Sequence, residues 1–277
     1  MTSGQQSTGP APKFDAFSNT PYDEVIRFSR ALSALLPPEE NPNEDFVLFQ
    51  SIHLMTEFSW YTMHYEFGWA TTHLADGAYT DAARLVRRAA RMQEVSTGLL
   101  ATLHDEFDQV RFLRLRELLP NGGSGLDSAG MKNMWPAAQR LWSAFERALD
   151  EHGCTLLEAM TGRPETESTS KAEGPLRDLG EVGQALFKLD DSVIAWQQAH
   201  QRLVWGRLGG HPVTRRGLST ADARRDMPKS LTGRPVDLLD GFVRRVLFPK
   251  LWHATDQICA QSPQLPSAAC PVHEETP

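Results

Sequence analysis

Apolar residues recur along this chain with the period of an α-helix almost throughout. The clearest run lies in residues 186–209, where one set of positions repeats at steps of three or four: Leu186, Leu189, Val193, Trp196, His200, Leu203 and Arg207. This spacing places the set on one helix face, and Gly209 and Gly210 end the helix. His200 thus occupies a core position one turn after Trp196. Such an imidazole is either a hydrogen-bonded core histidine or a ligand for a buried metal or haem iron.

The same period predicts further helical regions before and after this run. They cover residues 22–36, 46–74, 80–106, 107–119, 131–160 and 236–259, and Pro249 breaks the last of them. Residues 161–179 are rich in Pro, Glu, Ser, Thr and Gly and predict a surface connection. No alternating strand pattern and no repeat of fixed period occur. We therefore predict an all-α protein with one helical-bundle domain at residues 21–260, between disordered tails at 1–20 and 261–277.

The region 46–74 is apolar nearly all round, which predicts a central helix. Phe49, His53, Glu57 and Trp60 share one of its faces. A His and a Glu at this spacing either chelate a metal or form a hydrogen-bonded core pair, and the His-Glu-x-x-His pattern of metalloproteases is absent. We interpret Glu57 as structural.

Arginines cluster in the two following regions. We interpret Arg84, Arg87, Arg88 and Arg91 as the solvated face of the helix at 80–106. In the region 107–119, Arg111, Arg114 and Arg116 stand among apolar residues. Any of them that faces inward needs a carboxylate partner, because buried charges are rarely left unpaired.

Composition narrows the class of protein. The formal net charge of −7 in 277 residues argues against a nucleic-acid partner. No apolar run approaches the ~18 residues of a membrane span, and residues 1–20 contain no apolar core of a signal peptide. The three cysteines, Cys154, Cys259 and Cys270, are widely spaced and form no Cys-x-x-Cys pair. We expect a soluble protein of a reducing, cytoplasmic compartment.

Four segments, in order, resemble the tryptophan 2,3-dioxygenase superfamily of haem-dependent, all-helical oxygenases. They are residues 44–57 (EDFVLFQSIHLMTE), residues 107–119 followed by 124–128 (SGLDS), Trp196-x-x-x-His200 with Gly209 and Thr214, and residues 247–252 (LFPKLW). The resemblance covers most of the chain in fragments. It implies a helical domain that binds haem b.

The resemblance also assigns roles on the haem side of the site. His200 corresponds to the proximal ligand of the haem iron, with Trp196 and Ser124 also in contact with the haem. His53 corresponds to the distal catalytic residue. A neutral imidazole suits the axial position and leaves the opposite iron face open for O2.

On the substrate side, the resemblance implies an aromatic amino acid as substrate. Arg116 corresponds to the partner of the substrate carboxylate, which a guanidinium can hold through two parallel bonds. Phe49 and Phe112 would flank the aromatic ring, and Thr214 would bind the amino-acid head group. Tyr22 corresponds to a tyrosine that reaches into a neighbouring subunit's site, which implies a homotetramer, and at least a homodimer.

The chain departs from the family pattern in the loop at 213–217. The family's Gly-Thr-Gly-Gly-Ser appears here as Val-Thr-Arg-Arg-Gly, so a loop that folds over the substrate has lost flexible glycines. We therefore expect a divergent member that inserts one oxygen atom into tryptophan or a substituted tryptophan, such as β-methyltryptophan, and gives a 2-oxindole. The alternatives are ring cleavage to N-formylkynurenine, ring hydroxylation of tyrosine, and a non-catalytic helical binding protein.

Overall fold

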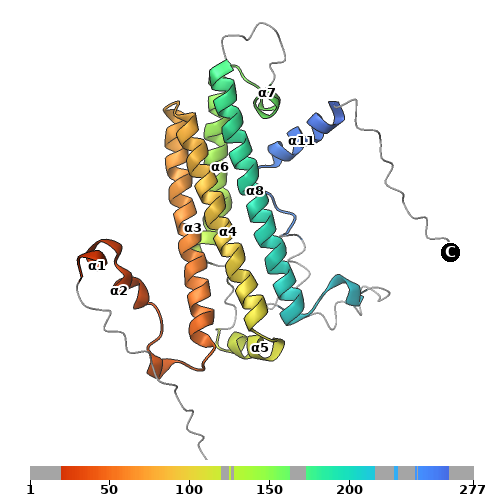
Figure 1. Cartoon of the computed structure of the whole chain (residues 1–277). Helices are drawn as coiled ribbons and strands as arrows, with labels where there is room; N and C mark the ends of the chain where they lie inside the picture. Colours follow the sequence, from red (N-terminus) through yellow and green to blue (C-terminus); the bar gives the residue numbers. More distant parts are fainter. Residues whose placement is uncertain are drawn as a thin grey trace, which may run out of the picture. The chain divides into compact units, whose positions relative to one another are not determined.

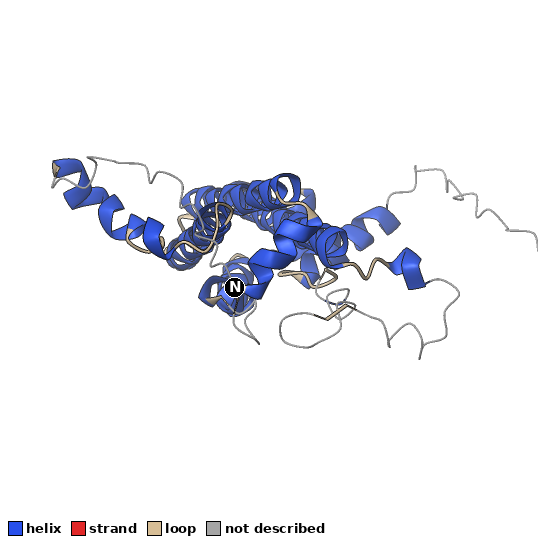
Figure 2. Ribbon diagram, turned by 90° about the horizontal axis from the view of Figure 1, so that it is seen from below, coloured by secondary structure: helices blue, strands red, loops and turns tan. Residues whose placement is uncertain are grey.

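The computed structural model describes residues 20–119, 125, 128–162, 173–215, 228–229, 241 and 243–261. These residues are helical, with no strand among them (Figure 2), which confirms the predicted all-α class. The tails predicted as disordered, apart from residues 20 and 261, lie outside the described residues. Within the described part of the chain, no helix combines the length and the apolar character needed to cross a membrane.

Four long helices dominate the chain (Figure 1). They are α3 (Phe46–Ala75), α4 (Tyr79–Glu106), α6 (Ala129–Glu151) and α8 (Glu173–Leu208). The shorter helices are α5 (Gln109–Glu117), α7 (Leu156–Thr161) and α11 (Pro249–Gln261). The predicted ends of α3 and α4 agree with the structure within one residue. As predicted, α8 ends before Gly209 and Gly210, which both have positive φ.

The prediction that residues 161–179 form a surface connection is wrong from residue 173 onward, because α8 starts there. The helix begins at Glu173, because the apolar period continues backwards through the buried Leu176, Leu179 and Val182. Sequence reasoning missed this helical period because the residues just before it are rich in Pro and Thr. Residues 163–172 lie outside the described residues.

The helix predicted at 22–36 is two short helices, α1 (Pro21–Ile26) and α2 (Phe28–Leu32). Arg27 lies between them with φ 60°, in the left-handed region. The Asp23 side chain accepts a hydrogen bond from Ser29 N at 2.9 Å, which satisfies a backbone donor beyond the break. Neither helix has a buried residue, so no packing holds the two turns in line.

Capping residues interrupt two other predicted helices. Asp108 ends the continuity of 80–119, because its side chain accepts from Arg111 N at 2.8 Å and caps α5. Thr155 and Glu158 form a capping box that starts α7, two residues after Gly153 with φ 61°. The break at Asp108 lies close to the predicted boundary between 80–106 and 107–119. Apolar periodicity continues through the break before Thr155, which is why the pattern alone did not locate that one.

The prediction that α3 is central is wrong for the single chain. One face of α3 is buried through Phe49, Ile52 and Trp60. The opposite face leaves Met55 43% and Phe58 56% exposed. Apolar residues on every side of a helix do not by themselves show whether other parts of the same chain cover each side.

The helices divide into two compact units, and the division falls inside all four long helices. Unit 1 comprises residues 1–62, 92–133 and 194–245, and unit 2 comprises residues 63–91, 134–193 and 246–277. All predicted site residues belong to unit 1.

Unit 2 has a well-satisfied buried carboxylate at its centre. Asp190 on α8 is fully buried and accepts hydrogen bonds from Leu247 N at 2.7 Å, Phe248 N at 3.0 Å and Trp252 Nε1 at 3.0 Å. Burial raises the pKa of Asp190, and the three hydrogen bonds oppose this shift. Asp190 thereby fixes the beginning of α11. The LFPKLW segment, which contributed to the family resemblance, is in this structure the partner of Asp190.

Candidate functional site

The site in unit 1 is built around Trp60 on α3. Its Nε1 donates to Gln93 Oε1 on α4 at 3.2 Å. Its side chain also lies against Gly130 at the start of α6, where an added Cβ would come within 2.7 Å of Trp60 Cβ. Its ring meets Trp196 of α8 edge to face, with ring centroids 5.2 Å apart. Three helices therefore fix this indole in position.

Trp196 in turn packs against His200. The two rings are stacked, with centroids 5.2 Å apart and an interplanar angle of 19°. The helical period places them one turn apart on the same face, as the sequence predicts. Gln197, the residue after Trp196, donates from Nε2 to Arg245 O at 3.0 Å and ties this part of α8 to the segment before α11.

His200 is held in its neutral form. Desolvation, together with a smaller effect of the nearby His53, lowers the pKa of His200 to about 4. The side chain is half-buried, and its Nδ1 atom is buried and has no hydrogen-bond partner among the described residues. A core histidine ordinarily satisfies its ring nitrogens, so this Nδ1 leaves room for a further partner at His200.

His53 and Phe49 form the facing part of the site on α3. Their rings lie 4.3 Å apart, and His53 Nδ1 contacts Phe49 O at 2.7 Å. The His53 side chain is exposed, yet desolvation by the surrounding protein lowers its pKa. A neutral His53 whose Nδ1–H donates to Phe49 O keeps Nε2 as an acceptor.

Glu57 is a structural residue at the edge of this site. Its Oε1 accepts from Gly130 N at 2.7 Å and so satisfies a backbone amide at the start of α6. This contact agrees with its structural interpretation. Its Oε2 is buried and has no hydrogen-bond partner among the described residues.

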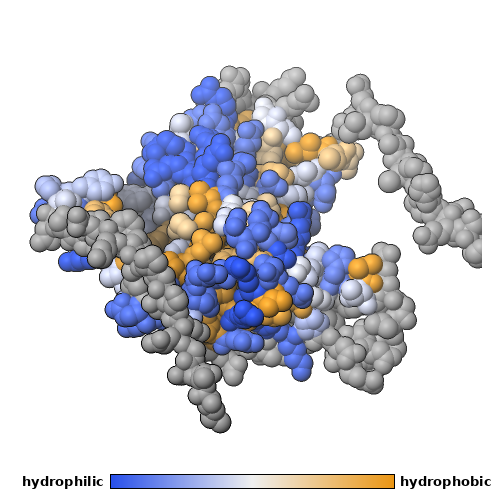
Figure 3. Space-filling model, turned by 60° about the horizontal axis from the view of Figure 1, so that its bottom comes forward, coloured by the Kyte–Doolittle hydropathy of each residue, from blue (hydrophilic) through white to orange (hydrophobic). Residues whose placement is uncertain are grey.

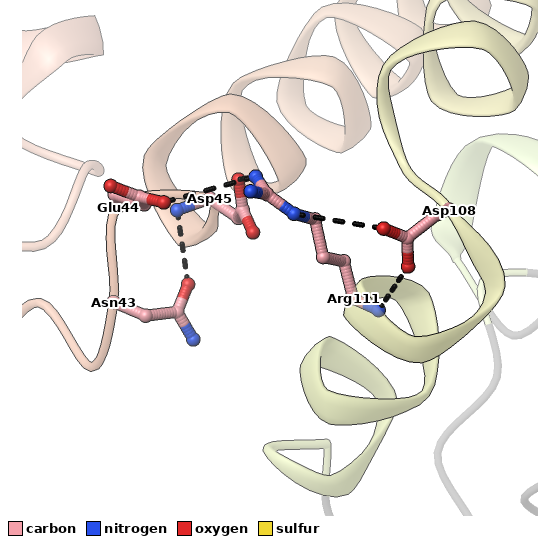
Figure 4. A network of polar contacts seen from close by, with 5 residues as sticks. All are labelled: Asn43, Glu44, Asp45, Asp108 and Arg111. Carbon is pink, nitrogen blue, oxygen red and sulfur yellow. Dashed lines mark hydrogen bonds and ion pairs between the residues drawn. The ribbon is translucent and has the colours of Figure 1, made fainter.

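Arg111 and Arg116 on α5 have different surroundings. Arg111 is held by carboxylates on both sides, with Asp45 at 3.2 Å and Glu44 and Asp108 at 3.8 Å (Figure 4). Its charge is therefore already balanced. Arg116 is half-buried and donates from one guanidinium nitrogen to Lys229 O at 2.6 Å, with no ion pair to a described carboxylate. Of these two arginines, Arg116 is the better placed to take an added carboxylate.

The remaining predicted residues are not all brought together. Phe112 is half-buried on α5, four residues before Arg116 and on the same face. Thr214 is exposed in the short 3₁₀ helix Pro212–Arg215, and its hydroxyl donates to His211 O at 2.7 Å. Tyr22 is 67% exposed on α1, with its ring 6.1 Å from Phe28. Ser124 lies outside the described residues.

Buried polar atoms without a hydrogen-bond partner gather in unit 1, as far as the chain is described. Those on the residues that surround Trp60 and Trp196 are His200 Nδ1, Gln93 Nε2, Gln197 Oε1 and Glu57 Oε2. Native proteins leave few such atoms, and each one asks for an explanation, such as a water, an ion or a ligand. Sequence reasoning did not select Gln93 or Gln197, because a glutamine at a buried helical position gives no pattern of its own.

The donor set suits one axial metal ligand rather than a metal cage. Within the described ranges, no three His, Cys, Asp or Glu side chains are grouped so that they could hold a metal ion. A haem needs only one protein ligand to its iron, since the porphyrin supplies the other four. A neutral imidazole with a buried and unpaired nitrogen, as at His200, fits that requirement.

No family model matches this chain, and a comparison with curated proteins finds no match.

Proposed function

We propose that this protein is a haem-dependent oxygenase that acts on the ring of an aromatic amino acid with O2. The preferred reaction is insertion of one oxygen atom into the indole of tryptophan or a substituted tryptophan, which gives a 2-oxindole, while the other atom of O2 is released as water at the expense of a two-electron reductant. The observation that carries this proposal is the state of His200: neutral, stacked on Trp196, and with a buried Nδ1 that has no partner among the described residues.

His200 would hold the haem iron, and Trp196 would fix the plane of its ring. The depressed pKa keeps the imidazole unprotonated at neutral pH, so that no proton competes with the metal. Trp60 acts as a positioning residue because its ring packs against Trp196. Gln93 supports it in turn, because its Oε1 accepts a hydrogen bond from Trp60 Nε1. When bound, haem supplies the oxygen chemistry, while the protein supplies binding and orientation.

His53 would orient the aromatic ring of the substrate. Because Nδ1 is engaged with Phe49 O, the free Nε2 can accept a hydrogen bond from an indole N–H or hold a proton from it. His53 also lies close enough to His200 to lower its pKa, which supports a place for both imidazoles in one site. Phe49, whose ring lies tilted against His53, offers an apolar wall for the ring of the substrate.

Arg116 would bind the carboxylate of the amino acid. Its guanidinium has five N–H donors, and the contact with Lys229 O uses one nitrogen. Two parallel bonds from the same guanidinium to a carboxylate would fix the orientation of the substrate. The roles of Thr214 and Tyr22 in the same site remain part of the proposal; Tyr22 would act in a neighbouring subunit of a homo-oligomer.

Binding of haem is the first test. The purified protein is titrated with haem, and the Soret absorption is recorded for wild type, His200→Ala and His104→Ala. His104 is an exposed histidine on α4 and serves as the matched control. We expect His200→Ala to lose the wild-type spectrum and His104→Ala to keep it. Unchanged spectrum and haem occupancy in His200→Ala would refute the proposed ligand.

The product separates the possible reactions. Haem-loaded protein receives reductant, labelled O2 and one of three substrates: tryptophan, β-methyltryptophan or tyrosine. A product of tryptophan with one labelled oxygen supports the 2-oxindole reaction, and two labelled oxygens indicate ring cleavage to N-formylkynurenine. Labelled product from tyrosine alone would indicate the ring hydroxylase. No turnover with any substrate would indicate a helical binding protein.

A further inference from the structure

A second regular face of α3 points away from the core. Its positions follow a strict heptad with steps of three and four: Leu48, Ser51, Met55, Phe58, Thr62, Tyr65, Trp69 and Thr72. We call these eight residues the α3 seam. All of them are exposed or half-buried, and Phe58, Tyr65 and Trp69 are each more than half exposed. Apolar side chains reach the surface among hydrophilic ones in Figure 3. Large apolar or aromatic side chains occupy five of these eight positions, and large apolar side chains at this spacing are typical of a helix that packs against another helix.

The α3 seam contains no charge. α3 has no lysine or arginine, and its two carboxylates, Glu57 and Glu66, are bound to Gly130 N and Arg88. The exposed positions of the neighbouring helix in sequence, α4, include Arg84, Arg87 and Arg91. A solvated helix face normally looks like α4. The α3 seam instead has the composition of a surface that is covered by protein.

We propose that the α3 seam packs against the α3 seam of a second copy of this chain, antiparallel, around a twofold axis near residue 60. A seam without charge offers nothing for a charged partner to recognise, whereas it is complementary to a second uncharged seam. A twofold axis brings the same patch of two chains into contact, so that each patch is covered by the other and no further copies can add to it. This proposal is independent of the haem and of the proposed reaction.

The sizes of the side chains select the antiparallel register. With the axis near residue 60, position 48 faces 72, 51 faces 69, 55 faces 65, and 58 faces 62. Three of these four pairs set a large residue against a small one: Leu48 with Thr72, Trp69 with Ser51, and Phe58 with Thr62. Alternation of large and small residues lets facing layers interdigitate. A parallel pair in register would set Trp69 on Trp69 and Ser51 on Ser51 instead.

The area that the face offers is of the right order. Six large side chains on α3 are substantially exposed: Leu48, Met55, Phe58, Tyr61, Tyr65 and Trp69. An aromatic side chain buries about 150–250 Å² when fully covered, so half of that for the four aromatic residues is on the order of 400 Å². A stable interface takes ~800 Å² from each partner. The aromatic residues of this face therefore supply about half of such an interface, and Leu48, Met55 and the smaller seam residues add to it.

The first test measures the mass of the assembly by light scattering after size exclusion, for the full chain without added ligand. We expect an even-numbered oligomer for wild type. Phe58→Glu places like charges in the middle of the seam and should halve the mass, with association weakened at least about a hundredfold. Val95→Glu, at an exposed apolar position on α4, is the matched control and should keep the wild-type mass. A monomeric wild type, or an unchanged mass for Phe58→Glu, overturns the proposal.

The second test reads the orientation. In a background with the native cysteines replaced by serine, Leu48→Cys and Thr72→Cys proteins are mixed under oxidising conditions. The antiparallel register predicts the mixed disulfide between the two proteins, because positions 48 and 72 face each other only across it. Disulfides within each protein alone would show a parallel pair, and absence of any cross-link would show that the seams do not meet. Either result overturns the proposed arrangement.

Discussion

The two units differ in how far their buried polar groups are paired. In unit 2, the fully buried Asp190 receives three hydrogen bonds. Glu66 Oε1 pairs with Arg88 at 2.7 Å, and Glu66 Oε2 is buried without a partner among the described residues. In unit 1, His200 Nδ1, Gln93 Nε2 and Gln197 Oε1 are buried without partners among the described residues. Both units follow the same helical pattern, so periodicity does not explain the difference. Most of the buried atoms without a partner among the described residues belong to unit 1, and we infer that unit 1 is organised to receive a further group.

The difference has an energetic consequence. An unpaired buried polar atom costs about 1–3 kcal/mol relative to a satisfied one. A site that keeps several such atoms gives up stability in the unliganded protein, and the bound group restores it. Removal of a paired polar group, such as Asp190 in unit 2, should therefore destabilise the protein. Removal of an unpaired one, such as His200 in unit 1, should stabilise the protein when no ligand is bound.

The largest effect is expected at Asp190 in unit 2. Asp190→Ala leaves two backbone amides and the Trp252 indole N–H without their acceptor. We expect a loss of about 3–5 kcal/mol in the free energy of unfolding, measured by urea denaturation. Asp191→Ala, at the exposed neighbouring position, should change it by less than about 0.5 kcal/mol. Equal effects of the two substitutions would contradict the assignment of Asp190 as the anchor of α11.

Acidification should weaken unit 1 through His200. Its pKa is about 4 in the folded protein, against an ordinary value of 6.5, so the unfolded chain takes up the proton first as the pH falls. Stability contributed by the neutral ring is present above pH 6.5 and is lost progressively down to pH 4. We expect this residue to account for roughly 2 kcal/mol of the loss between about pH 7 and pH 5. The measurement compares urea denaturation of haem-free wild type and His200→Leu at both pH values; equal pH dependence in the two would contradict it.

Substitution of the same residue should stabilise the haem-free protein at neutral pH. His200→Leu replaces a desolvated imidazole with an unpaired Nδ1 by an apolar side chain. We expect a gain of about 1 kcal/mol and a higher Tm, together with loss of haem binding. His152→Leu in unit 2 is the matched control, because it removes the 2.7 Å hydrogen bond to Tyr79 and should lower the Tm. A lower Tm for both variants would remove the contrast between the units.

Sequence reasoning located the helices and the two imidazoles but not their supports. The period of three to four residues placed His200 one turn from Trp196 and His53 on a face with Phe49, and the ring contacts agree with both placements. Trp60 stood on the same face as His53, yet its role depends on Gln93, Gly130 and Trp196, which come from three other helices. Which helices meet at one residue is decided by tertiary packing, and periodicity along a single helix does not contain that information.

Residues 22–36 and two residues of the predicted site, Thr214 and Tyr22, show the same limit of sequence reasoning. Residues 22–36 read as one helix because their apolar spacing is unbroken, but the side chain of Asp23 favours a break at Arg27. Thr214 and Tyr22 were assigned from resemblance alone, and the structure leaves both exposed in one chain.

The smallest effects on stability are expected for Arg111 and Arg116 on α5. These two arginines should differ in their effect on ligand binding. Arg111→Ala removes an exposed side chain that is already balanced by Asp45, Glu44 and Asp108, and exposed ion pairs contribute little. Arg116→Ala removes a guanidinium that has donors to spare for a carboxylate. We expect the affinity of haem-loaded protein for tryptophan, followed by the shift of the Soret band, to fall about tenfold or more for Arg116→Ala.

Two control variants decide whether this loss belongs to Arg116 itself. Arg111→Ala should change the affinity less than about twofold, because its charge is already balanced by neighbouring carboxylates. Arg116→Lys, which keeps the charge but not the two-pronged geometry, should fall between the two. An equal loss for Arg111→Ala and Arg116→Ala would mean that α5 attracts the substrate through its overall charge, and that the carboxylate is not held by Arg116 in particular.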